Sequence, residues 1–66
     1  MLSSEGFANA WGENDKKERT IFLSGGGIVI ADYYTGFSKN VSLFNHGFYI
    51  ARVFYSEIRK IKTSGE

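Results

Sequence analysis

The run Gly25-Gly26-Gly27 is the first feature of this sequence that could do chemistry, because glycine-rich loops cradle phosphate groups. A phosphate loop also needs a following helix whose amino end points at the anion, and a Lys-Ser or Lys-Thr pair. Here the β-branched segment Ile28-Val29-Ile30 follows, and no lysine lies nearby. The glycine run therefore predicts a tight hairpin turn.

Catalytic and metal-binding groups are sparse. His46 is the single histidine, it stands in the turn signal Asn45-His46-Gly47, and the chain has no cysteine. The two aspartates, Asp15 and Asp32, and the five glutamates show no metal-ligand spacing. The serines lack a nucleophile-elbow context. We therefore expect no catalytic residue, no metal and no cofactor, and a protein that is not an enzyme.

Aromatic and basic residues offer binding chemistry instead. Tyrosine and phenylalanine rings stack on single-stranded bases, and the candidates here are Tyr33, Tyr34, Phe37, Tyr49 and Tyr55. The basic residues of this part of the chain are Lys39, Arg52, Arg59, Lys60 and Lys62. In a chain this small the aromatic rings are also expected in the core and in interfaces. The basic residues fit a phosphate-facing stripe and a solvated edge equally well.

Length and composition limit what can position these groups. A chain of 66 residues forms one small domain, which buries only roughly 60% of its unfolded surface. Without cysteine it has neither disulfide nor thiolate zinc site, so either unusually apolar packing or self-association is expected to supplement its core. Its 42% hydrophobic content excludes a disordered chain. No apolar run approaches the ~20 residues of a membrane span, and no signal peptide is visible, so we expect a cytoplasmic protein without a membrane partner.

The pattern predicts one domain over residues 1–66. Phe7 and Trp11 share one helical face, and Ser3 or Ser4 can cap a helix over residues 4–13. This helix and the linker after it make up residues 1–18. Five short strands at close spacing predict a mainly β fold, a meander bent into a small open barrel over residues 19–62. The predicted strands are residues 20–23, 28–35, 41–44, 48–54 and 58–62, and residues 63–66 form a tail.

Four segments, in order, resemble the Sm-like (LSm/Hfq) family. The segment Glu5-Gly6-Phe7-Ala8-Asn9 is similar to the opening of the Hfq helix, and residues 20–26 are similar to the first strand and its hairpin. Asn40-Val41-Ser42-Leu43 resembles the end of the first Sm motif, and residues 53–58 resemble the second. The resemblance implies a short amino-terminal helix and five strongly bent antiparallel strands.

The resemblance also implies a homo-oligomeric ring of about five to seven subunits that binds single-stranded RNA, as an RNA chaperone or ribonucleoprotein scaffold. Asn40 would bind a base edge, Phe37 or Tyr55 would stack on the base, and Lys39 would neutralise a phosphate. The fourth strand would pair with the fifth strand of the next subunit. The implied interface residues are Phe48, Ile50, Arg52, Phe54, Ile58 and Ile61. The two-sided apolar character of residues 48–54 independently predicts a covered edge.

Two departures keep alternatives open. The first motif here contains Gly36-Phe37-Ser38-Lys39 without the usual aspartate, and Phe54-Tyr55-Ser56 replaces the Arg-Gly or Tyr-Lys-His of the second. These departures therefore weaken the RNA binding that the resemblance implies more than they weaken the implied assembly. One alternative is a structural or protein-interaction module on the same fold that binds no nucleic acid. Another is a truncated pleckstrin-homology-like domain, whose later strands residues 45–50 and 55–58 also resemble.

Overall fold

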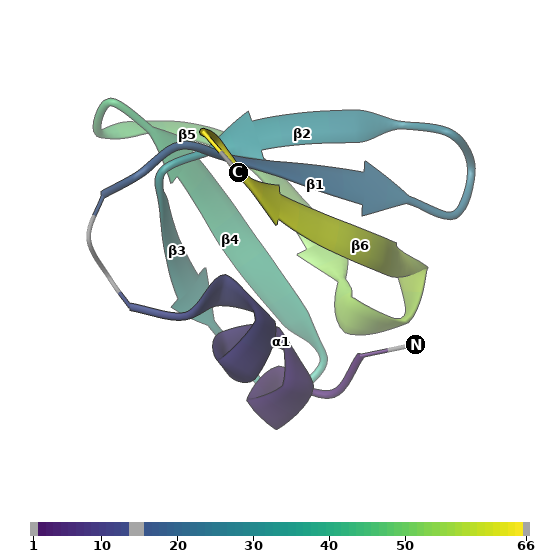
Figure 1. The fold of residues 1–66 in the computed structure, drawn as a ribbon. Helices are drawn as coiled ribbons and strands as arrows, with labels where there is room; N and C mark the ends of the chain where they lie inside the picture. The colour runs from purple at the N-terminus through teal and green to yellow at the C-terminus, as the bar shows by residue number, and fades with distance from the viewer. Residues whose placement is uncertain (1, 14–15, 66) are drawn as a thin grey trace.

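The residues that the computed structural model describes form one α-helix followed by six strands, and Figure 1 shows how these elements are arranged. The structure describes residues 2–13 and 16–65. Its elements are α1 (Ser4–Trp11), β1 (Arg19–Leu23), β2 (Ile28–Ala31), β3 (Tyr33–Gly36), β4 (Asn40–Asn45), β5 (Phe48–Phe54), the 3-10 turn η1 (Tyr55–Glu57) and β6 (Ile58–Thr63). The predicted mainly β class is confirmed. No helix of the described ranges is long and apolar enough to cross a membrane.

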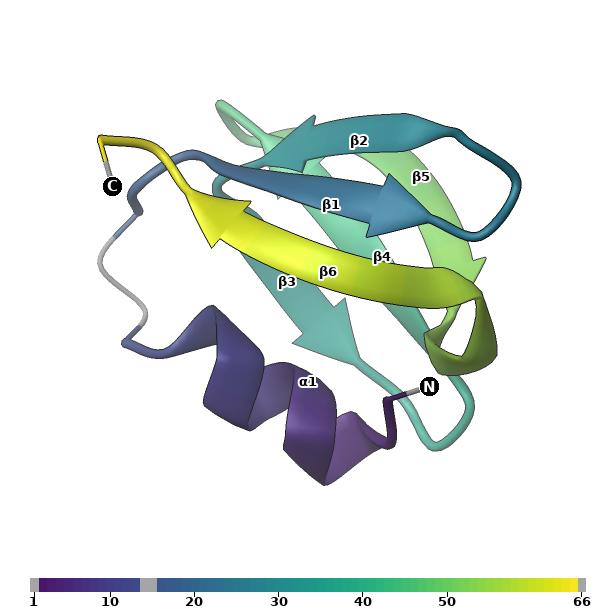
Figure 2. The same ribbon diagram turned by 45° about the vertical axis from the view of Figure 1, so that its right-hand side comes forward.

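The strands form two antiparallel sheets of three, with the orders β2-β1-β6 and β3-β4-β5. Figures 1 and 2 show the two sheets facing each other, with α1 lying across the opening between β3 and β6. The glycine run forms the β1–β2 hairpin, as predicted, with the Leu23 N–H donating to the Gly27 carbonyl at 2.8 Å. The strands β5 and β6, each an outer strand of its sheet, follow each other in the chain and are joined by η1.

The strand predicted over residues 28–35 is in fact two strands, so the fold has six strands rather than five. The chain breaks at Asp32, where its backbone N–H donates to the Phe44 carbonyl at 2.9 Å and its carboxylate accepts the His46 N–H at 3.2 Å. These bonds keep the chain attached to β4 while it turns from one sheet into the other. The described residues therefore form two sheets and not a closed barrel.

The helix is shorter than predicted and ends at Trp11, where the N–H of Gly12 donates to the Ala8 carbonyl at 3.1 Å. Its start is as expected, because the Ser3 hydroxyl accepts the Gly6 N–H at 3.0 Å. Residues 14 and 15 of the predicted linker, and residue 66 of the predicted tail, lie outside the described residues. Thr63, assigned to that tail, is the last residue of β6.

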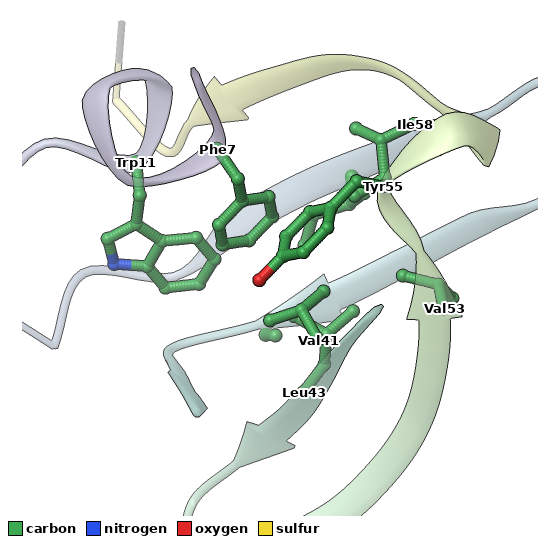
Figure 3. Packing of buried hydrophobic residues seen from close by; sticks show 9 residues of the cluster. Phe7, Trp11, Val41, Leu43, Val53, Tyr55 and Ile58 are labelled. Atoms are coloured by element: carbon green, nitrogen blue, oxygen red, sulfur yellow. The ribbon is translucent and has the colours of Figure 1, made fainter. Parts of the chain in front are cut away.

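The core lies between the sheets and under the helix (Figure 3). Phe7 and Trp11 pack their shared face onto the sheets, as the helical spacing predicts, with exposed fractions of 0% and 1%. The ring of Phe7 contacts those of Trp11 and Tyr55 at centroid distances of 5.7 and 5.6 Å, and that of Tyr34 at 4.8 Å. The other buried apolar residues are Ile21, Ala31, Val41, Leu43, Val53 and Ile58.

Arg19 attaches the segment after the helix to this core. Its side chain is buried, and its guanidinium lies 4.7 Å from the centre of the Trp11 ring. The same group donates to the carbonyls of Lys17 and Glu13, at 2.9 and 3.2 Å. The first residue of β1 therefore holds both the end of the helix and the chain that follows it.

Trp11→Ala is expected to lower the free energy of unfolding by about 3–5 kcal/mol, because it empties a buried aromatic site. Denaturant unfolding followed by circular dichroism measures this loss, and Trp11→Phe serves as the control that keeps a ring and loses less. Since the indole is buried, the wild-type tryptophan emission should be blue-shifted. A solvent-like emission maximum would contradict this packing.

Candidate functional site

A cavity of about 380 Å³ opens where three distant segments of the chain meet. These are the amino end of α1, the β3–β4 turn over residues 37–39, and the passage from β5 into η1. Figure 2 shows all three at the same end of the molecule, near the N-terminus. The lining residues are Leu2, Ser3, Ser4, Ser38, Lys39, Phe54, Tyr55 and Ser56. The turns before β4 and β6, which contain the predicted RNA-binding residues Phe37, Lys39 and Tyr55, are thus neighbours in this chain.

Tyr55 fixes the β3–β4 turn against η1. Its backbone N–H donates to the Lys39 carbonyl at 3.1 Å, and its hydroxyl donates to the Phe37 carbonyl at 2.9 Å. The approach is close, because a β carbon on Gly36 would lie 3.0 Å from the Tyr55 hydroxyl oxygen. A side chain at position 36 would therefore force the Tyr55 hydroxyl to shift by a few tenths of an ångström, so Gly36 favours the close contact that holds the cavity wall.

The turn η1 is also fixed from its other side. The Glu57 carboxylate accepts the Phe54 N–H at 3.1 Å, and the Glu57 carbonyl accepts the Ser24 N–H at 2.7 Å. These bonds hold the Phe54 ring at the rim of the cavity, where 53% of the residue is exposed. The resulting site offers an exposed aromatic face, the Lys39 ammonium and several serine hydroxyls. This set suits a ligand with a flat ring and a negative charge.

The hydroxyl of Tyr55 lies in an apolar environment, and this burial raises its pKa above the ordinary value of 10.0. The hydrogen bond to the Phe37 carbonyl opposes the burial effect. The neutral form of Tyr55 is therefore the form that the folded state favours.

The structure places two of the four predicted RNA-binding residues, Lys39 and Tyr55, in the cavity lining. Asn40 is half-buried at the start of β4, beside Lys39, and does not line the cavity. Phe37 points elsewhere: its ring is 51% exposed and lies 5.6 Å from the Arg52 guanidinium. The four residues thus lie near one another without forming a single site.

The predicted stacking role of Tyr55 requires correction, because the residue is only 4% exposed and its ring belongs to the core. The adjacent Phe54, which the sequence assigned to an interface, presents the exposed ring instead. Strand alternation contained this signal. Val53 and Tyr55 both face the core, and Phe54 between them faces out.

The predicted interface residues lie on β5 and β6, and most of them are accessible. On β5, Phe48, Ile50 and Phe54 are exposed by 74%, 47% and 53%, and Arg52 is also exposed. On β6, Ile61 is half-buried against the core. Ile58 is fully buried within its own chain, so its side chain cannot take the predicted part in an interface.

No group of three or more metal-ligating side chains occurs among residues 2–13 and 16–65. No family model, curated protein or solved structure matches this chain.

Tyr55→Phe is expected to lower the free energy of unfolding by about 1 kcal/mol near neutral pH, because it leaves the Phe37 carbonyl without its donor. In the wild type, the free energy of unfolding should fall as the pH rises above 10. There the unfolded state releases the Tyr55 proton and the folded state, with its raised pKa, still holds it.

Chemical denaturation at pH 7 and above pH 10 measures both effects. The phenylalanine variant lacks the titrating hydroxyl, so its stability should fall less between the two pH values than that of the wild type. Tyr49→Phe, at a residue 57% exposed, is the control and should leave the midpoint at pH 7 unchanged. Equal losses between the two pH values in the wild type and in Tyr55→Phe would show that this hydroxyl is not the group responsible.

Proposed function

We propose that this protein is an Sm-like open barrel that assembles into a homo-oligomeric ring and binds single-stranded RNA. Each subunit would bind one nucleotide in the cavity between the β3–β4 turn and η1. The observation that carries this proposal is the meeting of these two turns at one cavity that presents Lys39 and the exposed ring of Phe54. The family resemblance requires the same two turns to meet.

The outer strands β5 and β6 support assembly. The orders β2-β1-β6 and β3-β4-β5 leave β5 and β6 each with one unpaired side within the described chain. An unpaired strand with exposed Phe48 and Ile50 is prone to pair with another chain. If β5 of one subunit pairs with β6 of the next, the contact is head-to-tail, and such a contact forms a ring when its rotation closes. About five to seven subunits follow from the family resemblance.

The cavity lining supports RNA as the ligand. A base stacked on Phe54 is worth about 1–3 kcal/mol, and Lys39 supplies the positive charge for a phosphate. The serine hydroxyls around the cavity can donate to or accept from the base and the sugar. Because a ring repeats the site, weak binding at each subunit adds up to useful avidity.

A charge introduced on β5 tests the assembly. Ile50→Lys is expected to convert the oligomer to monomers at micromolar concentration, because the lysine would lie in an apolar contact between chains. Light scattering after size-exclusion chromatography measures the mass. Ile28→Lys is the matched control, since Ile28 is 58% exposed on β2, which takes no part in the proposed pairing of β5 with β6. A monomeric wild type, or an oligomer in which Ile50→Lys changes nothing, would refute the ring.

Substitutions in the cavity test RNA binding. Phe54→Ala is expected to weaken binding of a fluorescent oligo-U about 5- to 150-fold for each subunit that the RNA contacts, which corresponds to the loss of one stacked base per subunit. Lys39→Ala should weaken binding to all sequences and flatten the slope of log affinity against log salt by about 0.7 per contacted subunit.

Phe37→Ala is the control for these variants, because its exposed ring lies outside the cavity. Fluorescence anisotropy on oligomers of unchanged mass measures the affinities. If the wild type binds no oligo-U, or if Phe54→Ala and Lys39→Ala bind as tightly as it does, this site is wrong. The protein-interaction module then becomes the better function.

A further inference from the structure

A second cavity, of about 420 Å³, lies at the opposite end of β4. It is lined by Lys16, Asp32, Tyr33, His46 and Gly47. These residues come from the segment before β1, from the junction of β2 with β3, and from the β4–β5 hairpin. It shares no residue with the first cavity.

The walls of this cavity are held by hydrogen bonds between distant parts of the chain. His46 and Gly47 both have positive φ values, 51° and 81°, as a two-residue hairpin of type I′ requires. The Asp32 carboxylate accepts the His46 N–H at 3.2 Å. The Asn45 side-chain amide donates to the Ile30 carbonyl at 3.2 Å and to the Glu18 carboxylate at 3.3 Å. The hairpin is thus fixed onto the break between the two sheets.

Tyr33 supplies an aromatic wall that is backed by neighbouring rings. Tyr33, Phe44 and Tyr49 are register partners on three adjacent strands. Their ring centroids are 5.8 Å and 5.9 Å apart along the row. Because Phe44 supports it from the side, the Tyr33 ring keeps its orientation, and the residue is still 40% exposed. A supported and accessible ring is a ready surface for stacking.

The polar groups select the ligand that such a ring would hold. The Asp32 carboxylate only accepts hydrogen bonds at neutral pH, so it favours a ligand that carries an amino group. The Lys16 ammonium favours a ligand that also carries a negative charge, which a neutral sugar does not. A nucleotide whose base has an exocyclic amino group combines a flat ring, a donor and a phosphate.

We propose that this second cavity binds an adenine, cytosine or guanine nucleotide and discriminates against uracil. The base stacks on Tyr33, its amino group donates to the Asp32 carboxylate, and its phosphate contacts Lys16. Uracil has no amino group, and its carbonyl oxygens repel the carboxylate. The site belongs to a single chain, so it depends neither on the ring nor on the cavity around Lys39.

Amide chemical shifts of the ¹⁵N-labelled protein during titration with AMP, CMP, GMP and UMP test the proposal. The first three nucleotides are expected to shift the amides of His46 and Gly47. The affinity for UMP should be lower by a factor of about ten or more. Tyr33→Ala should abolish these shifts, and Tyr33→Phe, which keeps the ring, should retain them. Lys16→Ala should reduce the affinity for AMP to that for adenosine.

Asp32→Asn separates recognition from folding. The carboxamide keeps an oxygen that can accept the His46 N–H, and it adds a donor that can reach a uracil carbonyl. UMP should then bind about as well as AMP. Equal binding of UMP and AMP to the wild type, or shifts confined to the amides around Lys39 and Ser56, would overturn the second site. Shifts at His46 and Gly47 with none around Lys39 would instead support it and count against the RNA cavity proposed above.

Discussion

The side chain of Tyr55 is the contact on which the rest of this structure depends. Its ring packs against Phe7 of the helix, its hydroxyl binds the Phe37 carbonyl, and its backbone N–H binds the Lys39 carbonyl. One residue therefore joins the helix, the β3–β4 turn and η1, which are far apart in the sequence. The close approach of its hydroxyl to Gly36 leaves little freedom in this arrangement. The first cavity exists because these three segments cannot separate without exposing Tyr55.

The small core explains why so much apolar surface stays outside. One short helix over two three-stranded sheets covers the central strand β4 on both faces, at Val41, Ser42 and Leu43, but leaves most of β5 uncovered. Strand β5 turns Val53 inward, while Phe48 and Ile50 remain exposed. In the proposed ring another copy of the chain would cover this strand, and the added burial would stabilise a domain of this size. The small size that limits the core would thus also leave the surface for the proposed association.

The sequence predicted those features that are set by local pattern. Helix spacing placed Phe7 and Trp11 in the core, and turn residues placed the hairpins. The break at Asp32 was missed because it is decided by His46, fourteen residues later, whose N–H binds the Asp32 carboxylate. No periodicity within residues 28–35 carries that information. The inward orientation of Tyr55 follows that of Val53 two residues earlier, because the alternation along β5 continues into the first residue of η1.

The two cavities are built by the same device at the two ends of β4. At one end Tyr55 holds a turn against η1, and at the other Asp32 holds a hairpin against the break between the sheets. In each case a side chain from one strand end binds a backbone group of a neighbouring turn, which fixes the wall of a cavity without filling it. Six residues of β4 separate the two ends, a span of roughly 20 Å at ~3.3 Å per residue. Ligands at the two ends would therefore be too far apart to touch each other, and under the two proposals each cavity would recognise its own nucleotide by its own contacts.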